Sequence, residues 1–308
     1  MVQKLLHYHI SRKLGEGKHG EVSLGWDSGL DRVVAIKCLS RGLIPDNLRE
    51  QFLNDMQRLA RLNDPHIGVF YSLELIDSQQ YIVREYIEGD TIKDLVRAGL
   101  FEYERFLALG CQLTGTLQRM HEAGLFHLNI TSQNVFVTRS GQAKLLDFGL
   151  PFDKARSAVT EVCHGDLVYL APEQISGDQV DERTDMYSLG IVFYEMLTGK
   201  LPFPTDERSA LKRAILDGCP DFTSQEARAI PSEATLLLKK LLAGNPDDRF
   251  ASTAGLHVTL EEMLSFRHED RHFPTRAEPA RTPRQYLILA VLVVLLLVVW
   301  IVVIMNWK

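Results

Sequence analysis

Two polar segments joined by a predicted β-hairpin constrain the fold of this chain more than any other feature. The first segment, from His127 to Asn134, reads His-Leu-Asn-Ile-Thr-Ser-Gln-Asn, and the second is the Asp-Phe-Gly triplet that begins thirteen residues later at Asp147. Between them, the apolar runs 134–137 and 143–146 flank a Ser-Gly turn, which is the pattern of two short antiparallel strands. The sequence therefore predicts a loop, a hairpin and a polar turn in this order.

This stretch resembles the catalytic loop and metal-binding turn of the protein kinase family, whose loop reads His-Arg-Asp-x-Lys-x-x-Asn. In that family the loop Asp accepts the proton of the substrate hydroxyl, and the loop Lys contacts the transferring phosphate. Here the Arg is Leu128, the Asp is Asn129 and the Lys is Thr131. The resemblance implies that Asn134 and Asp147 are the oxygen ligands for magnesium. The scaffold of the site is kept, whereas its chemistry is altered.

A glycine-rich segment near the N-terminus has the pattern Gly-x-Gly-x-x-Gly. Its glycines are Gly15, Gly17 and Gly20. Such a motif also opens dinucleotide-binding folds, where a helix follows, but here residues 21–26 have the pattern of a strand and an Ala-Ile-Lys run ends at Lys37. The kinase resemblance implies that the glycines approach ATP phosphates, that Val22 and Ala35 cover the adenine, and that Lys37 pairs with the α- and β-phosphates. The alternative is a plain β-turn with a surface lysine.

Two charged positions depart from the family pattern. The spacing of apolar residues predicts an amphipathic helix over 47–63, which carries Asp55 where the family has the Glu that pairs with the strand lysine. The strand that begins at Tyr81 leads to a glycine-marked hinge, and the kinase resemblance implies that Arg84 lies at the back of the adenine pocket. Because a buried cation needs a partner, we expect Arg84 to contact Asp55. The alternatives are a register shift of one residue and a solvated Asp55.

The hinge and the floor of the pocket complete the predicted nucleotide site. The alignment assigns Glu85 and Ile87 of the hinge to cofactor binding. It also puts Phe136 beneath the adenine, where the family more often has Leu. The cofactors that the resemblance implies are ATP and magnesium.

Asn129 decides the predicted chemistry. A neutral amide cannot take up a proton at physiological pH, and a positioned general base contributes about 10²- to 10⁴-fold in rate. Thr131 also removes a cation from the phosphate-binding part of the site. Phosphoryl transfer depends chiefly on positioning and charge stabilisation, so these losses together predict little or no transfer.

Asp166 offers one possible compensation. The segment 165–173 has Asp166 where the family usually has a Thr that hydrogen-bonds to the catalytic Asp, so a carboxylate stands near the position of the missing one. One hypothesis is that Asp166 takes over as the base. The alternatives are that it bonds to the Asn129 amide or faces water.

Three charged residues of the C-terminal half match positions that stabilise the fold of the protein kinase family. Asp185, in the apolar run that ends at Gly199, corresponds to the Asp that tethers the backbone of the catalytic loop. Arg249 matches the arginine that pairs with the Glu of Ala-Pro-Glu, which is Glu173 here. The physical reason for the pair of Arg249 with Glu173 is that a buried charge needs a buried partner of opposite charge.

The resemblance spans residues 8–265 and implies an α+β fold of two lobes. We expect a protein-kinase-like domain over residues 1–266, with a small β-rich lobe at 1–87 and a larger helical lobe at 88–266. A long buried helix expected over 101–123 suits the core of the larger lobe.

The composition indicates a globular chain with no nucleic-acid partner. Of its 308 residues 45% are hydrophobic, and the net charge of -6 gives no basic footprint of the kind that nucleic-acid binders need. The four cysteines are widely spaced, so neither a zinc site nor a disulfide framework is expected. The N-terminus lacks the apolar core of a signal peptide, and a reducing cytosol fits this part of the chain best.

The C-terminal residues have the pattern of a membrane anchor. Residues 267–285 are polar and rich in arginine and proline, which is typical of a linker. Residues 286–305 carry no charge and are long enough for one helix to cross a bilayer. The arginines before this span predict that the kinase-like domain lies in the cytoplasm and that 306–308 form a short extracytoplasmic tail. The lipid bilayer is thus an expected partner of this single-pass, tail-anchored chain.

Two functional hypotheses follow. The first is a membrane-anchored pseudokinase that binds Mg-ATP and acts through cytosolic protein partners. The alternative is an active serine/threonine protein kinase that transfers the γ-phosphate of ATP to protein substrates with a non-standard or missing base. The altered residues of the catalytic loop favour the first, whereas the intact glycine segment and Lys37 support nucleotide binding in both.

Overall fold

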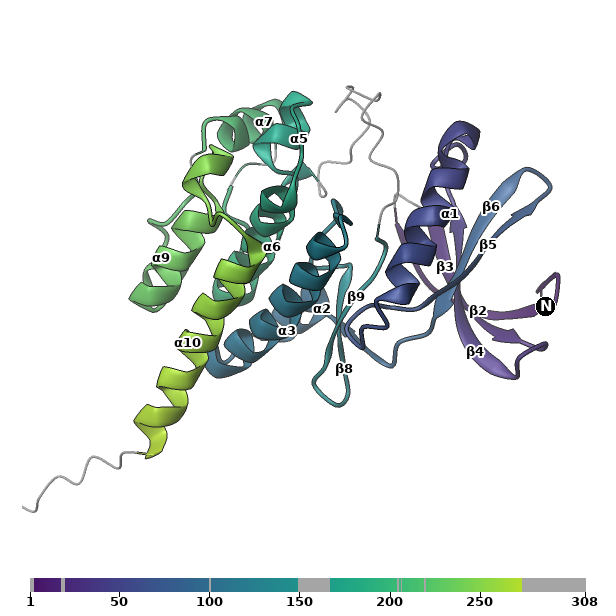
Figure 1. Ribbon diagram of the computed structural model, residues 1–308, viewed down its shortest axis with the longest axis horizontal. Helices are drawn as coiled ribbons and strands as arrows, with labels where there is room; N and C mark the ends of the chain where they lie inside the picture. The colour runs from purple at the N-terminus through teal and green to yellow at the C-terminus, as the bar shows by residue number, and fades with distance from the viewer. Residues whose placement is uncertain are drawn as a thin grey trace, which may run out of the picture. The chain divides into compact units, whose positions relative to one another are not determined.

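The computed structural model describes residues 3–17, 20–99, 101–148, 167–203, 205, 207–218 and 220–272. Residues 1–264 form one compact unit, in which a β-rich part is followed along the chain by a helical part (Figure 1). This is the α+β, two-lobed architecture that the sequence predicts.

The small lobe is built on an antiparallel sheet with the strand order β1-β2-β3-β4-β6-β5. The strands are β1 (Gln3–Leu5), β2 (Tyr8–Gly17), β3 (Gly20–Asp27), β4 (Arg32–Leu39), β5 (Phe70–Ile76) and β6 (Gln79–Glu85). One face of the sheet has its own cluster of buried residues, which includes Val34, Ile36 and Val83. The other face joins the main core through Leu39 and Ile82. Burial on both faces explains why β4 is almost continuously apolar.

Helix α1 (Asp46–Arg61) is the only long helix among the described residues of the small lobe, and the sequence predicts it within two residues at each end. Phe52, Met56 and Leu59 are buried and follow each other at helical spacing, so they form the face that packs on the sheet. Acidic Asp46 in the first turn and Arg58 in the last turn match the helix dipole.

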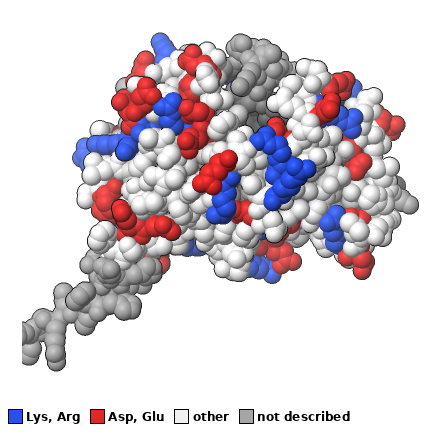
Figure 2. Space-filling view, viewed as in Figure 1, with Lys and Arg blue, Asp and Glu red and all other residues white. Residues whose placement is uncertain are grey.

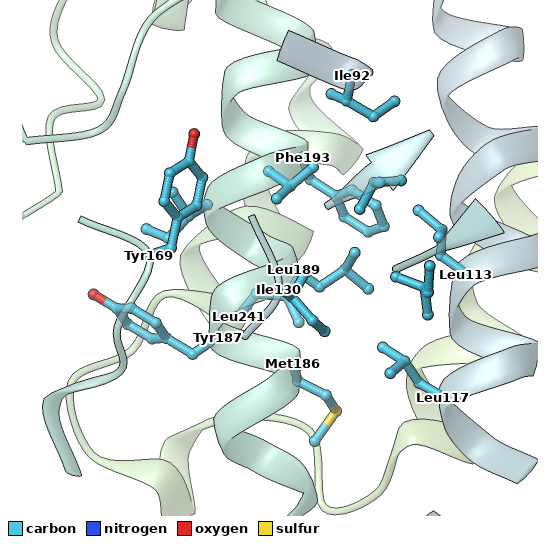
Figure 3. Packing of buried hydrophobic residues seen from close by; sticks show 14 of the residues in the cluster. Ile92, Leu113, Leu117, Ile130, Tyr169, Met186, Tyr187, Leu189, Phe193 and Leu241 are labelled. Carbon is cyan, nitrogen blue, oxygen red and sulfur yellow. The ribbon is translucent and has the colours of Figure 1, made fainter. Parts of the chain in front are cut away.

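The large lobe is organised around α6 (Glu182–Thr198), which is buried along nearly its whole length. Its neighbour α3 (Tyr103–Glu122) corresponds to the long helix that the sequence predicts at 101–123. Phe193, Leu189 and Met186 of α6 point toward Leu113 and Leu117 of α3 (Figure 3). A helix that is buried on nearly all sides must be covered by other elements, which agrees with the central position of α6.

The other described elements of this lobe surround these two helices or face the small lobe. A second sheet has the order β7-β8-β9, and its β8–β9 pair is the hairpin that the sequence predicts. The elements are β7 (Gly89–Thr91), α2 (Ile92–Ala98), β8 (Val135–Thr138), β9 (Ala143–Leu145), α5 (Pro172–Ser176), α7 (Arg208–Leu216), α8 (Gln225–Arg228), α9 (Ser232–Leu241), the 3-10 helix η2 (Pro246–Asp248) and α10 (Thr253–His272).

The C-terminal boundary differs from the prediction. Helix α10 continues to His272, so the first residues of the expected linker, 267–272, are helical. The rest of that linker, the expected span 286–305 and the tail 306–308 lie outside the described residues. Within the described part of the chain, no helix is both long and apolar enough to cross a membrane.

Candidate active site

A cleft of about 660 Å³ is lined by residues of both lobes. Such a volume is in the range of small-molecule and cofactor sites. The predicted nucleotide, metal and catalytic-loop residues that the structure describes all line this cleft; they are Gly15, Gly17, Gly20, Val22, Ala35, Lys37, Glu85, Ile87, Asn129, Asn134, Phe136 and Asp147. Asp166 lies outside the described residues.

The glycine segment forms the end of the β2–β3 hairpin, with Gly17 paired to Gly20. Gly20 has φ 124°, and a Cβ atom there would lie 1.7 Å from the carbonyl oxygen of Cys38. Only glycine permits this approach of β3 to β4. The resulting register pairs Val22 with Lys37, which brings the predicted adenine cover and the predicted phosphate ligand to the same end of the sheet.

Lys37 forms a buried ion pair with Asp147. Its Nζ atom lies 2.6 Å from Asp147 Oδ2, and the two side chains are 6% and 9% exposed. Asp147 itself has φ 58°, a left-handed conformation that is uncommon for residues other than glycine. The lysine of the small lobe and the acid of the Asp-Phe-Gly turn thus meet directly in the cleft.

The predicted contact between Arg84 and Asp55 is wrong. Arg84 Nη1 lies 3.2 Å from Asp147 Oδ1, whereas Asp55 forms an ion pair with Arg58 of the following turn at 3.4 Å. The reason is the orientation of α1, whose buried face is apolar, so that Asp55 is left partly exposed beside Arg58. The strand register is as predicted, because Arg84 pairs with Ala35 across β4 and β6 and lines the cleft.

The catalytic loop is held from below by Asp185 of α6, as the sequence predicts. Its Oδ2 accepts a hydrogen bond from the backbone N–H of His127, and its Oδ1 accepts one from Leu128, both at 2.7 Å. His121 Nε2 lies 2.8 Å from the same carboxylate. This tether fixes the left-handed backbone of Leu128, which has φ 56°. The loop therefore keeps a defined geometry although three of its residues differ from the family pattern.

The two loop asparagines hydrogen-bond toward the Asp-Phe-Gly turn and to each other. Asn129 Nδ2 donates to the carbonyl oxygen of Asp147 at 3.1 Å, and Asn134 Nδ2 donates to the carbonyl oxygen of Asn129 at 2.8 Å. The hydroxyl of Thr131 also takes part, because its Oγ1 accepts a hydrogen bond from the backbone N–H of Asn134 at 3.3 Å. The position of the missing base is thus occupied by a neutral amide, which donates a hydrogen bond to the turn.

Asn134 and Asp147 carry the oxygen atoms that magnesium prefers. However, both carboxylate oxygens of Asp147 already contact a cation. Oδ2 contacts the ammonium group of Lys37, and Oδ1 contacts the guanidinium group of Arg84. Among the described residues, no three His, Cys, Asp or Glu side chains converge on a second candidate metal site. The donor set in this conformation does not fit a magnesium ion, because the ion would compete with two cations for its only carboxylate.

The hinge turns the Glu85 side chain away from the adenine side of the cleft. Both of its carboxylate oxygens lie 2.8 Å from Lys144 Nζ on β9, and Oε2 also accepts from Val69 N at 3.1 Å. A contact from Glu85 to a nucleotide would therefore use its backbone. Phe136 lies on β8, is partly buried and also lines the cleft.

His127 links the catalytic loop to the turn. Its ring lies edge-on to Phe148, with 5.8 Å between ring centroids. Complete burial lowers the pKa of His127, and the nearby Asp185 and Asp147 carboxylates oppose this shift only in part. The imidazole is therefore neutral at physiological pH.

Two buried polar contacts stabilise the large lobe beneath the site. Glu173 accepts two hydrogen bonds from Arg249, at 2.8 and 2.9 Å, so the pair that the sequence predicts is present and bidentate. Tyr169 donates to Glu195 Oε2 at 2.6 Å. Burial, with the neighbouring Glu195 carboxylate, raises the pKa of Tyr169, so its hydroxyl stays protonated.

Sequence reasoning missed part of the cleft wall. The first turns of α2 contribute Lys93, Asp94 and Arg97, in addition to Thr91 at the helix N-cap. The position of this short helix directly after the hinge was the available signal, because a helix that begins there must pass the mouth of the cleft.

The profile of the protein kinase domain matches residues 8–260 of this chain. The chain belongs to the protein kinase domain family. This match covers both lobes and all the residues that line the cleft.

Several bacterial serine/threonine kinases are similar to the chain. The serine/threonine-protein kinase PksC of Streptomyces coelicolor is 34% identical over 263 residues, which are 81% of this chain and 47% of PksC. PknL of Mycobacterium tuberculosis is 31% identical over 263 residues, which are 83% of this chain and 65% of PknL. The chain thus matches less than two thirds of the length of each of these relatives.

Solved structures show the same fold. The crystal structure of the Mycobacterium tuberculosis PknI kinase domain has a TM-score of 0.66 and 26% sequence identity with this chain. The similarity covers 84% of this chain and 97% of the PknI domain. The chain is therefore a serine/threonine protein kinase-like protein of the bacterial type.

Proposed function

We propose that this chain is a membrane-anchored pseudokinase that binds adenine nucleotide and acts through cytosolic protein partners. The observation that carries this proposal is the Asn129 side chain, whose Nδ2 donates to the Asp147 carbonyl oxygen at 3.1 Å. A neutral amide at this place cannot take up the proton of a substrate hydroxyl at physiological pH. Thr131 contributes a hydroxyl where the family has a phosphate-binding cation.

The cleft supports the nucleotide part of the proposal. The protein kinase family generally uses Mg-ATP. Here the cleft of about 660 Å³ is lined by the glycine hairpin, the buried Lys37 and the hinge. The Asp185 tether keeps the loop in place, so the scaffold for binding is retained where the chemistry is not.

Phosphate transfer from labelled ATP by the full chain in detergent, to itself and to a basic protein substrate, tests the loss of catalysis. We expect transfer no higher than in the Asp147→Ala variant, which serves as the background. The double variant Asn129→Asp with Thr131→Lys restores the base and the cation, so we expect it to raise transfer by about 10²-fold or more.

The second candidate function is an active serine/threonine kinase with Asp166 as the replacement base. Transfer by the unmodified chain that disappears in Asp147→Ala would establish this activity and contradict the pseudokinase proposal. Loss of that transfer in Asp166→Ala, with retention in Asp178→Ala as the control, would then assign the base to Asp166. Asp178 follows α5 and does not line the cleft.

The anchor is a separate part of the proposal, supported by the uncharged residues 286–305. We expect the full chain to stay in the membrane pellet after alkaline carbonate extraction. A variant that ends at residue 285 should move to the soluble fraction. A protease added from the outside of intact cells should leave the kinase-like domain uncut, because we propose a cytoplasmic location for it.

The outer surface carries both signs of charge. On the face shown in Figure 2, patches of Lys and Arg alternate with patches of Asp and Glu. A mixed surface of this kind favours protein partners with complementary patches over a polyanion.

A further inference from the structure

Arg84 is a buried cation whose hydrogen-bonding capacity is largely unused. It is 8% exposed and lies at the end of β6, where it lines both the main cleft and a small adjoining apolar pocket. Its Nε and Nη1 atoms are buried and make no hydrogen bond with any described atom. The contact of Nη1 with Asp147 at 3.2 Å is an ion pair without hydrogen-bond geometry. A buried arginine in this state is costly unless a further acceptor completes it.

The charges around Arg84 do not balance. Lys37 and Arg84 share the single carboxylate of Asp147, which leaves an excess of one positive charge in a buried cluster. No other acid at the cleft compensates for it among the described ion pairs. The Glu85 carboxylate is taken up by Lys144, and Asp94 lies 3.8 Å from Arg97.

The helix that supplies an acid in the kinase family does not supply one here. The α1 side chains that reach the small pocket beside Arg84 are Phe52, Met56 and Leu59. Asp55 is paired with Arg58 at 3.4 Å. The excess positive charge is therefore not met from α1 and is available for an anion that enters the cleft.

Magnesium and Arg84 would each supply positive charge between the Asp147 carboxylate and the phosphates of a bound nucleotide. A divalent ion at Asp147 would place positive charge between that carboxylate and the phosphates. Arg84 and Lys37 already hold positive charge at both oxygens of Asp147. A third cation there meets repulsion from two buried neighbours, whereas a phosphate meets attraction.

We propose that Arg84 takes the electrostatic place of the divalent ion, so that this chain binds adenine nucleotide without magnesium. The inference rests on the proposed nucleotide binding and deepens it, because it states which form of the nucleotide is the ligand. Free ATP or ADP, which carries more negative charge than its magnesium complex, is the species that complements the excess charge of the cluster.

Binding of a fluorescent ATP analogue to the full chain in detergent, with ATP as competitor, tests the proposal. We expect the Kd of ATP in excess EDTA to agree within about threefold with the Kd in excess magnesium. Arg84→Met keeps the length of the side chain and removes its charge. In EDTA this variant should bind ATP at least about tenfold more weakly, and magnesium should restore part of the loss.

Two further variants complete the design. Arg58→Met is the matched control, because it removes an arginine that is paired with an aspartate outside the cleft, and its Kd values should equal those of the unmodified chain. Arg84→Lys retains the charge and should still bind ATP in EDTA. If Arg84→Met does not fold, the comparison of EDTA with magnesium on the unmodified chain decides the question alone.

The possible failures are distinguishable. Binding of ATP by the unmodified chain only when magnesium is present would overturn the role of Arg84 and leave nucleotide binding intact. An equal Kd in EDTA for the Arg84→Met variant and the unmodified chain would also overturn it. Absence of ATP binding under both conditions would overturn the proposed nucleotide binding itself, and with it this inference.

Discussion

The carboxylate of Asp147 has two cationic neighbours, and neither cation has an ion pair with another acid in the part of the chain that the structure describes. Among the described ion pairs, Lys37 has none with an acid of α1, and Arg84 extends from the last residues of β6 into the cleft. Both side chains are about nine-tenths buried, so neither can be stabilised by water alone. At the residue scale, the cleft is thus defined by a shortage of negative charge.

His127 gives a residue-scale prediction about pH. Because burial lowers its pKa in the fold, the unfolded chain takes up the proton at higher pH than the folded chain does. The contribution of His127 to the free energy of unfolding is therefore fully present above the unfolded pKa of about 6.5. It declines as the pH falls from there toward the lowered pKa of the folded state, with a limiting slope of about 1.4 kcal/mol per pH unit.

Denaturant unfolding at a series of pH values, for the unmodified chain and for His127→Phe, measures this contribution. Phe keeps a ring against Phe148 and cannot be protonated, so the decline below pH of about 6.5 should be shallower in the variant. His9→Phe on β2, where the residue is partly exposed, is the control and should retain the slope. Identical slopes in all three chains would show that His127 is not protonated on unfolding in this range.

Helix α1 determines, at the scale of elements, which side chains reach the cleft. Its buried positions, Phe52, Met56 and Leu59, recur at intervals of four and three residues. This apolar stripe sets the orientation of the helix. The position of the Asp55 side chain results from that orientation and not from its own charge. An isolated surface ion pair such as that of Asp55 with Arg58 is too weak to rotate a helix against its buried face.

Substitutions on the exposed and the buried face of α1 should affect different properties, ATP affinity and stability. We expect Asp55→Ala to change the Kd of ATP by less than about twofold, since Asp55 does not contact Lys37 or Arg84. Phe52→Ala should lower the free energy of unfolding by about 3–5 kcal/mol, because it leaves a cavity against the sheet. A tenfold loss of ATP affinity in Asp55→Ala would instead mean that α1 turns Asp55 toward the cleft when nucleotide binds.

Segments far apart in the sequence are joined in the large lobe by one buried ion pair. Glu173 at the start of α5 and Arg249 after η2 are 76 residues apart, and their side chains are 5% and 0% exposed. Thr184 of α6 donates to the same carboxylate at 2.8 Å, so three elements meet at this pair. At the scale of the whole domain, this pair connects the region below the catalytic loop to the C-terminal helices.

Arg249→Met tests this connection. Removal of one partner leaves the Glu173 carboxylate buried and uncompensated, so we expect the free energy of unfolding to fall by about 3–5 kcal/mol. Adding Glu173→Gln to Arg249→Met should recover part of the loss, because no charge then remains buried. Lys200→Met, which removes a surface pair with Glu226, should leave the urea midpoint unchanged. Equal midpoints for Arg249→Met and Lys200→Met would contradict a role of the buried pair in stability.

Much of the fold and most of the site could be predicted from the sequence, because short motifs carry them. The glycine pattern up to Gly20 predicts the hairpin, since only glycine tolerates the approach to Cys38. The kinase resemblance of the segment that forms α6 implies a buried central helix and the tether of the loop by Asp185, and the structure has both. In each case a residue of one short motif carries the physical requirement, which is a backbone approach, burial or a hydrogen-bond acceptor.

The partners of Arg84 and Asp55 were decided only by the tertiary structure. The resemblance of the sequence to the kinase family predicted that Arg84 is a buried cation in need of an anion, and the pairing of Arg84 with Ala35 confirms the register. The sequence did not determine which anion, because both Asp55 and Asp147 are compatible with the spacing along the chain. The choice depends on the rotation of α1 about its axis, and packing of its apolar face on the sheet sets that rotation.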